Sequence, residues 1–534
     1  MSSEIITSKH KKQSLHIWSG LLFSLCLSLL SELILGTSFG WIDVPTSVAR
    51  VCALLLTCFI IHRFALRALP SFALGIRKNL FTLGIILLGT VSTIWLGRIF
   101  AYSIAAYSKQ SNLISTVSPD SVLFAIPWST GVLIIQAIIG IEYALVASLI
   151  TALFAGMYFE QDAMLVPYVL CSTLVAALSL VKFRSRSSYI RAGISVALVT
   201  LPLTITSFLL TPEVSPADVP VRILAGFSSG IIAAFLAAGI TPLFEYFGDY
   251  VTDMRLIELA TLDHPLLKEL SVQAPGTWNH SMVMGMMAES AAEAVGANSV
   301  IARVGAYFHD IGKLKKPLYF VENQAGEENR HDKLSPSMSA LIIRSHVKDG
   351  LEMAKKHHLP LTIQDMIPQH HGTSVIEYFY DKALKEAKEL GLEAETVDKS
   401  LYTYPGPRPQ TKEAGILMLA DSIEAAARTL PDPTADRIQG MVQKLINKIF
   451  SSGQLNECQL TLQELHRIAK CFTRVLTGIY HQRIAYAEPA EKIKDVESDG
   501  HQKKTVERDS TTEDKKDRSE DLKRLGIENG TVAD

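Results

Sequence analysis

The sequence predicts an all-α protein in which a polytopic helical membrane domain is followed by an all-helical cytoplasmic domain. Apolar runs long enough to cross a bilayer recur throughout the first half of the chain. The second half shows helical spacing of apolar residues and no clear run of alternating strand pattern. A chain with 19% charged residues and a mean hydropathy of +0.22 must concentrate its apolar residues in one part, which agrees with this division.

The N-terminal region carries the first predicted membrane span. Residues 1–14 contain several lysines and are expected in the cytoplasm, whereas residues 15–36 are apolar enough to cross a hydrocarbon core of roughly 30 Å. A cleaved signal peptide is the competing interpretation. The apolar run is long for a signal peptide and no clear small-x-small cleavage site follows it, so we favour a retained span.

A seven-span helical membrane domain is expected over residues 48–244. Its apolar runs cover 48–61, 80–99, 121–140, 141–159, 163–181, 190–210 and 223–244. Eight spans in total place two basic clusters on the side of the lysine-rich N-terminus: Arg63, Arg67, Arg77 and Lys78, and Lys182, Arg184, Arg186 and Arg191. Because positive residues favour the cytoplasmic side, the chain after the last span should lie in the cytoplasm. A soluble protein with this many buried helices would need an enormous core.

The second half is expected to contain a linker, a globular domain and a tail. Residues 245–274 predict a linker helix, and residues 275–486 predict an all-α globular domain with glycine and proline at its helix ends. The amphipathic segment 444–483 is expected to pack on this domain or on a partner subunit, and the second option would give a homodimer through the cytoplasmic domain. Residues 491–534 are more than half charged and lack aromatic residues, which predicts a disordered tail.

Charge and cysteine content argue against two classes of protein. The formal net charge is −2, so no basic excess indicates binding to a nucleic acid polymer. Four of the six cysteines lie in apolar stretches, and Cys458 and Cys471 are far from them in sequence. This distribution is not a disulfide framework.

Histidines cluster in the second half of the chain. Nine of the fifteen lie between His264 and His371. The pair His309-Asp310, followed by Gly312 and Lys313, is expected at the last turn of a helix, since apolar residues at helical spacing precede it and glycine terminates helices. One such pair is weak evidence, but clustered imidazoles and carboxylates are typical of metal sites.

Seven side chains are candidate metal ligands: His280, His309, Asp310, His346, His370, His371 and Asp421. They exceed the needs of one zinc ion, and they fit two divalent ions that share a bridging carboxylate and keep open positions for water and substrate. Asp421 lies in an apolar helical segment, where an unpaired carboxylate would be costly. Lys313 and Arg428 could contact a phosphate held over the metals, although a solvated charge is the alternative for both.

These residues resemble the pattern of the HD hydrolase superfamily, whose members bind divalent metals and hydrolyse phosphate esters. Three motifs closely resemble the seven-transmembrane HD family, the PgpH-type cyclic-di-AMP phosphodiesterases: Pro275-Gly276-Thr277-Trp278-Asn279-His280-Ser281, His370-His371-Gly372-Thr373 with Tyr378-Phe379-Tyr380, and Tyr404-Pro405-Gly406-Pro407. The resemblance covers about residues 50–486. It implies an HD-type phosphohydrolase domain over residues 275–486 in a multi-pass protein of the bacterial inner membrane.

The resemblance also implies roles for the site residues. One metal would be bound by His280, His309, Asp310 and Asp421, and the other by Asp310, His346, His370 and His371, so that Asp310 bridges the two. The ions would be manganese or iron, and a water between them would attack phosphorus and open the cyclic dinucleotide to linear pApA. His309, Asp310 and Lys313 are then the expected catalytic residues, and Lys313 and Arg428 the expected substrate contacts.

Other functions stay open on the residues alone. An HD hydrolase for guanosine tetraphosphate would use the same metal chemistry, whereas cyclic-di-GMP hydrolysis would require a Gly-Tyr-Pro signature soon after the histidine doublet, where Gly372-Thr373 stands instead. A non-catalytic nucleotide-binding membrane receptor should lack one or more ligands, and all seven are present. Family members usually carry a large extracytoplasmic domain after the first span. Only about residues 36–45 are available here, so sensing through such a domain is not expected.

Overall fold

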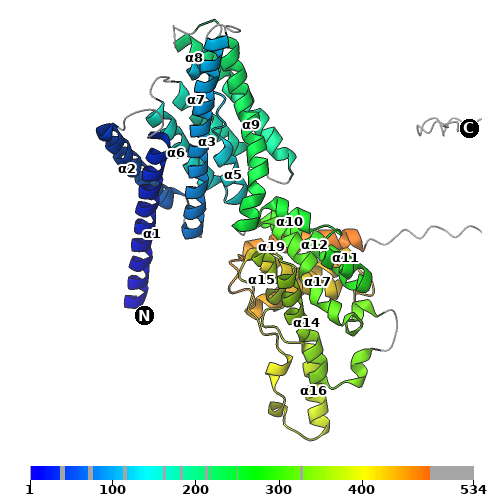
Figure 1. Ribbon diagram of the computed structural model, residues 1–534. Coiled ribbons are helices and arrows are strands. Elements are labelled where there is room, and N and C mark those ends of the chain that lie inside the picture. The colour runs from blue at the N-terminus through cyan, green and yellow to red at the C-terminus, as the bar shows by residue number, and fades with distance from the viewer. Residues whose placement is uncertain are drawn as a thin grey trace, which may run out of the picture. The chain divides into compact units, whose positions relative to one another are not determined.

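The computed structural model describes residues 2–36, 43–69, 72, 76–111, 117–159, 164–180, 185–210, 215–216, 218–248, 250–324 and 329–480, with side chains from residue 16 onward. Helices follow one another through these ranges (Figure 1), and the only extended pairing within them is an isolated antiparallel bridge between Val375 and Thr403. The all-α fold is therefore confirmed. The predicted disordered tail, and Lys182 and Arg184 of the second basic cluster, lie outside the described residues.

Six of the described helices are long and apolar enough to cross a membrane. They are α1 (Ser2–Ser31), continued by a π-helical turn (Glu32–Gly36), α2 (Val44–Ala68), α3 (Ile76–Ser111), α6 (Ile141–Tyr158), α8 (Ser187–Leu210) and α9 (Asp218–Phe247). A shorter apolar helix, α7, covers Leu165–Ser179. Residues 2–14, which were expected as a separate N-terminal segment, belong to α1. This helix begins at Ser2, and its membrane-crossing part begins at His16.

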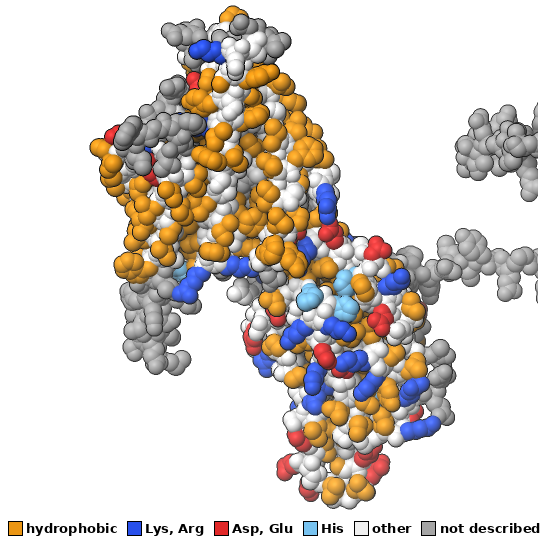
Figure 2. Space-filling model, viewed as in Figure 1, with side chains coloured by type: hydrophobic (Ala, Val, Ile, Leu, Met, Phe, Trp, Pro, Cys, Tyr) orange, Lys and Arg blue, Asp and Glu red, His pale blue; other side chains and the backbone are white. Residues whose placement is uncertain are grey.

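The surface of these helices is apolar. Figure 2 shows hydrophobic side chains over the outside of the helices of the first half, while charged side chains are spread over the second half. Among the apolar ones, Phe64, Phe81 and Phe235 are 65%, 71% and 67% exposed. Such a surface is costly in water and stable in lipid, so the chain is a multi-pass membrane protein.

The span expected over residues 121–140 is wrong as a single helix. The segment forms α4 (Pro119–Leu123) and α5 (Thr130–Ile138) with a break that contains Pro127, because proline lacks an N–H and clashes with the preceding turn. The Tyr168 hydroxyl donates to the Phe124 carbonyl at 2.8 Å, and the Ser229 hydroxyl donates to the Ile126 carbonyl at 2.7 Å. These bonds satisfy the broken backbone inside the protein, which membranes require.

The predicted linker helix is also divided. Residues 245–274 contain the end of α9, then α10 (Asp253–Leu259) and α11 (Pro265–Gln273). The Thr252 hydroxyl caps α10 by accepting a hydrogen bond from the Arg255 amide at 3.1 Å. Pro265 then begins α11, since its fixed φ and missing N–H suit the first turn of a helix and not the interior.

The globular half is built from helices around one main core. Its longer helices are α12 (Pro275–Val295), α13 (Ser299–Phe308), α14 (Pro336–Lys356), α15 (Leu361–Gln369), α16 (Glu377–Glu389), α17 (Lys412–Ala427), α18 (Ala435–Ser451) and α19 (Leu462–Ile479). Short 3-10 helices cover Ile311–Lys315, Pro317–Tyr319, Val321–Asn323, Arg330–Lys333, Ala394–Thr396 and Lys399–Tyr402. Apolar residues of α18 and α19 belong to the same core as those of α12, α13 and α17. The described part of the amphipathic segment, residues 444–480, therefore packs on the domain itself.

Candidate metal centre

The pair His309-Asp310 lies directly after α13. Asn298 begins this helix, because its side chain accepts hydrogen bonds from the amides of Val300 and Ile301, each at 3.0 Å. The helix ends at Phe308, and Asp310 precedes the 3-10 helix Ile311–Lys315. Both side chains are buried, with His309 0% and Asp310 1% exposed. The chain turn between two helices thus carries an imidazole and a carboxylate into the interior.

Gly312 allows this turn to touch α14. A Cβ atom on Gly312 would lie 1.9 Å from the His346 carbonyl oxygen and 2.5 Å from the Gly350 amide nitrogen. Any side chain would push the two segments apart, so glycine is needed here for close backbone approach. The contact brings Asp310 to His346, because the two residues lie on the segments that touch.

Asp310 lies between two groups of histidines. Its Oδ2 atom is 3.1 Å from Nε2 of His309 and 4.0 Å from Nε2 of His280, which projects from α12. Its Oδ1 atom is 3.3 Å from Nε2 of His346 and 3.8 Å from Nε2 of His370. One carboxylate therefore faces both groups, with a different oxygen toward each.

The ligand atoms within each group are close together. Donor atoms of His280, His309 and Asp310 all lie within 4.8 Å of one another, and so do those of His346, His370 and His371. Asp421 of α17 reaches both groups, because its Oδ1 is 3.1 Å from His280 Nε2 and its Oδ2 is 3.5 Å from His371 Nδ1. The structure thus brings all seven candidate ligands into one cluster.

Hydrogen bonds to the backbone orient three of the rings. Nδ1 of His309, His346 and His370 lies 2.7, 2.6 and 2.6 Å from the carbonyl oxygen three residues earlier. A ring that donates through Nδ1 presents the lone pair of Nε2, and in each case Nε2 is the atom that approaches Asp310. The backbone therefore selects the tautomer that can bind a metal ion.

The protonation states suit metal binding. Burial lowers the pKa values of His346, His370 and His371, and that of His371 falls to about 3. These rings are neutral at pH 7, which is the form that binds metals. Burial alone would raise the pKa of Asp310, but the neighbouring His309 and Lys313 hold it well below its usual range. Asp310 is therefore an anion.

The donor set fits a pair of divalent cations. Among the described residues, the buried atoms His309 Nε2 and Asp310 Oδ1 have no hydrogen-bond partner. Unpaired buried polar atoms cost free energy, and a metal ion would satisfy both. Imidazole nitrogens together with a shared carboxylate are ligands that manganese and iron accept.

Two carboxylates beside the cluster, Glu322 and Glu424, were not predicted from the sequence. Glu322 accepts a hydrogen bond from Lys313 Nζ at 2.6 Å, and the same nitrogen lies 2.7 Å from Asp310 Oδ2. Glu424 lies 2.5 Å from Nδ1 of His280 and is 1% exposed. Its position three residues after Asp421 on one helix was a usable signal, since such residues share a face. The site is thus surrounded by a second layer of charge.

The two residues predicted to contact substrate, Lys313 and Arg428, both pair with carboxylates. Lys313 is largely buried and paired with two carboxylates, which raise its pKa even though burial alone would lower it. Arg428 donates to Glu424 at 2.7 Å. The arginine does not line the cavity beside the cluster, because its guanidinium points to the carboxylate one helical turn back. Arg428 is therefore placed to orient Glu424.

A cavity of about 690 Å³ opens beside the cluster. Its wall includes His370, His371 and Asp421 of the cluster, together with Tyr404, Arg408, Lys399, Lys448 and Gln454. The ring of Tyr404 stacks on His371 with centroids 4.1 Å apart, and Arg408 Nε donates to the Thr373 hydroxyl at 3.2 Å. A cavity of this size, with cations and candidate metal ligands in its wall, can hold a nucleotide.

Comparison with known families places both halves of the chain. Residues 45–252 match the family described as "7TM receptor with intracellular HD hydrolase", and residues 277–426 match the HD domain. The cyclic-di-AMP phosphodiesterase PgpH of Bacillus subtilis is 37% identical over 390 residues, which are 72% of this chain and 54% of that protein. PgpH of Listeria monocytogenes is 36% identical over 401 residues, or 74% and 54% of the two chains.

The chain spans about half the length of these curated relatives. Among solved structures, the HD domain of L. monocytogenes PgpH in complex with cyclic-di-AMP is 46% identical, with a TM-score of 0.39. The alignment covers 42% of this chain and 100% of that domain.

Proposed function

Because this chain belongs to the seven-transmembrane HD hydrolase family, we propose that it is a membrane-anchored phosphodiesterase that hydrolyses cyclic-di-AMP to linear pApA. The observation that carries the proposal is the position of Asp310, whose two oxygens face two separate histidine groups. The relatives named cyclic-di-AMP phosphodiesterase support the choice of substrate.

Two divalent ions, manganese or iron, would occupy the cluster. His280, His309, Asp310 and Asp421 would hold one, and Asp310, His346, His370 and His371 the other. When bound, such ions activate a water molecule and neutralise charge on the phosphoryl oxygens. Hydrolysis then adds water across one P–O bond, which leaves a phosphate monoester on one nucleoside and a free hydroxyl on the other.

The chain's own residues position the ligands and the substrate. Lys313 pairs with Asp310 Oδ2 and with Glu322, so it keeps the bridging carboxylate fixed and charged. Tyr404 supports His371 by stacking on its ring. Arg408 carries a guanidinium in the cavity wall, where it can pair with the second phosphate of a cyclic dinucleotide.

We also place the HD domain in the cytoplasm and the helices in the bacterial inner membrane. The basic residues of the first half support this orientation. Arg63 and Arg67 end α2, and Arg77 and Lys78 begin α3. Arg186 directly precedes α8, and Arg191 lies in its first turns. When successive spans alternate in direction, α3 and α8 cross the membrane in the same direction, so their basic N-terminal ends share one side.

A substrate panel tests the function. The full chain, purified in detergent and loaded with manganese, is incubated with cyclic-di-AMP, cyclic-di-GMP or guanosine tetraphosphate, and the products are identified by mass spectrometry. The proposal expects pApA from cyclic-di-AMP at a kcat/KM above the other two. Faster turnover of another nucleotide would reassign the substrate, and tight binding without turnover would favour a receptor.

A further inference from the structure

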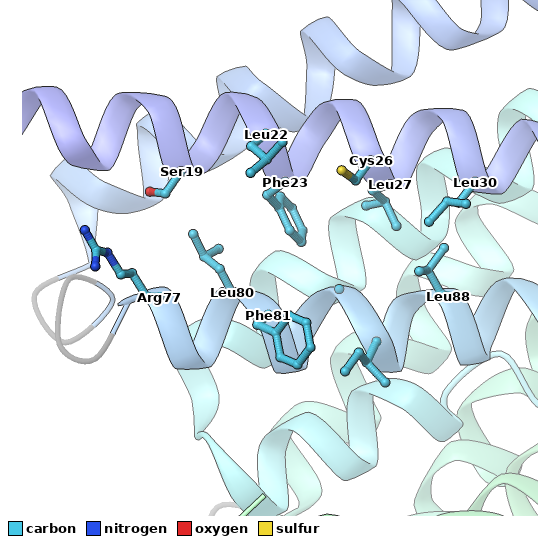
Figure 3. A pocket seen from close by; sticks show the side chains of 12 residues that line it. Ser19, Leu22, Phe23, Cys26, Leu27, Leu30, Arg77, Leu80, Phe81 and Leu88 are labelled. Atoms are coloured by element: carbon cyan, nitrogen blue, oxygen red, sulfur yellow. The ribbon is translucent and has the colours of Figure 1, made fainter.

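An apolar groove runs between α1 and α3 on the membrane half (Figure 3). It encloses about 480 Å³ and is lined along α1 by Ser19, Leu22, Phe23, Cys26, Leu27 and Leu30, and along α3 by Arg77, Leu80, Phe81, Gly84, Ile85 and Leu88. Figure 3 shows the side chains of the two helices facing one another, with Ser19 and Arg77 together at one end. The groove is therefore apolar along its length and polar at one end.

The groove has a closed floor and an open side. Leu27 and Leu80 are 2% and 4% exposed, whereas Leu22 and Phe81 are 63% and 71% exposed. The exposed pair forms a rim that faces the hydrocarbon region, and the buried pair forms the floor. Gly84 faces the Phe23 ring, since a Cβ atom there would lie 3.6 Å from it, and a larger side chain at this position would fill the middle of the groove. An acyl chain can thus enter sideways from the bilayer.

The length of the groove matches one leaflet. From Ser19 to Leu30 along α1, and from Arg77 to Leu88 along α3, the helices rise by about 16 Å, which is close to half of a hydrocarbon core of roughly 30 Å. The polar end would then lie at the depth of the phospholipid phosphates. A fatty acyl chain from this leaflet would run along the groove to the middle of the bilayer.

The polar end of the groove carries the positive charge of Arg77. Arg77 is exposed and has no ion pair among the described residues. Its neighbour Lys78 instead lies over the Tyr250 ring, 4.3 Å from the centroid. An arginine fork binds a phosphate through two hydrogen bonds, and this end of the bundle is the one we place at the cytoplasmic leaflet, where anionic lipids gather.

We propose that this groove is a binding site for an anionic phospholipid, with one acyl chain between α1 and α3 and the phosphate on Arg77. The lipid would fill the space that the two helices leave between them and would hold α1 against the rest of the membrane half. The proposal is separate from the hydrolase activity, since none of the groove residues belongs to the HD domain.

Native mass spectrometry of the full chain in detergent tests the site, with phosphatidylglycerol and phosphatidylcholine of identical acyl chains as probes. The wild type should bind phosphatidylglycerol about fivefold more tightly, the preference expected from one arginine at the membrane surface. Arg77→Ala should bind both lipids equally. Arg67→Ala is the matched control, because Arg67 is an exposed arginine in the last turn of α2 outside the groove, and it should keep the wild-type preference.

Two filling variants test the acyl part of the site. Gly84→Leu and Leu22→Trp should each weaken binding of both lipids at least fivefold while hydrolysis by the HD domain persists, which shows that the chain is folded. Equal binding of the two lipids by the wild type would overturn the proposal. So would an unchanged preference in Arg77→Ala, an equal loss in Arg67→Ala, or undiminished binding in whichever filling variant folds.

Discussion

The carboxylate of Glu424 lies 2.5 Å from Nδ1 of His280, across the imidazole from the nitrogen that approaches Asp310 and Asp421. The other oxygen of Glu424 accepts a hydrogen bond from Arg428 at 2.7 Å. Arg428 therefore holds Glu424, and Glu424 orients His280. An outer carboxylate of this kind fixes the tautomer of a metal-binding histidine and raises its basicity.

Glu424→Gln should weaken manganese binding by about 10- to 100-fold, because an amide orients and polarises the ring less well than a carboxylate. Binding is measured by manganese titration of the metal-free chain at pH 9, where competition from protons is small. Glu289→Gln is the control, since this carboxylate of α12 pairs with Arg303 at 3.1 Å, away from the cluster. Equal losses in the two variants would contradict an orienting role for Glu424.

Manganese affinity should depend on pH through His280. Burial alone would lower the pKa of this histidine, but Asp421 and Glu424 raise it to about 9 in the absence of metal. Below pH 9 an incoming ion must displace this proton, so affinity at that position should fall about tenfold for each pH unit between 9 and 7.

The second ion provides the internal control. His346, His370 and His371 have lowered pKa values and are already neutral over this range, so their ion should bind with nearly constant affinity from pH 7 to 9. Titrations at pH 7, 8 and 9 measure both sites. If neither affinity changes with pH, then His280 is not protonated in the metal-free chain over this range, and the raised pKa of His280 is contradicted.

Gly312→Ala should destabilise the HD domain by about 2–4 kcal/mol, because the added Cβ must push apart the backbones of α14 and the turn that carries Asp310. Gly440→Ala is the matched control, since no atom lies within 4 Å of its added Cβ in α18, and it should be neutral or stabilising by up to about 1 kcal/mol. Thermal unfolding of the metal-free chain measures both. A Gly312→Ala variant as stable as the wild type would refute the tight contact.

Replacing Arg408 or Arg428 should affect different kinetic parameters. Arg408 lines the cavity, so Arg408→Ala should raise the KM for cyclic-di-AMP roughly tenfold with little change in kcat. Arg428→Ala should weaken manganese binding and leave KM unchanged once manganese is saturating. Steady-state kinetics over a manganese series measure both. A raised KM in Arg428→Ala at saturating manganese would favour the substrate contact predicted from the sequence.

The sequence could indicate which side chains to consider together because metal-binding chemistry uses few residue types. Imidazoles and carboxylates concentrated in one helical domain are typical of metal sites, and the structure gathers all seven candidates into one cluster. Spacing could have indicated Glu424, which follows Asp421 by three residues on one helix. It could not indicate Glu322, which comes to Lys313 only through the fold. The pairing of Arg428 could not be predicted for the same kind of reason. Arg428 shares a helical face with Asp421, but in the fold its guanidinium pairs with Glu424 one turn earlier.

Hydropathy also set the limit of the membrane prediction. Six of the expected spans form long helices, but a run of apolar residues says little about a break inside it. Pro127 was the visible signal in the interrupted segment, and its neighbours Tyr168 and Ser229 come from helices that the local sequence does not show. Their hydroxyls satisfy the freed carbonyl groups, so the break depends on tertiary packing.

The most direct test of the bridging role proposed for Asp310 is Asp310→Ala in the full chain, with bound metal and cyclic-di-AMP hydrolysis measured on the same samples. The wild type should retain two ions per chain after removal of free manganese and should release pApA. The variant should lose tightly bound metal and all detectable hydrolysis, while its circular dichroism spectrum stays that of a folded helical protein. A folded variant that keeps two ions and full activity would contradict the assignment.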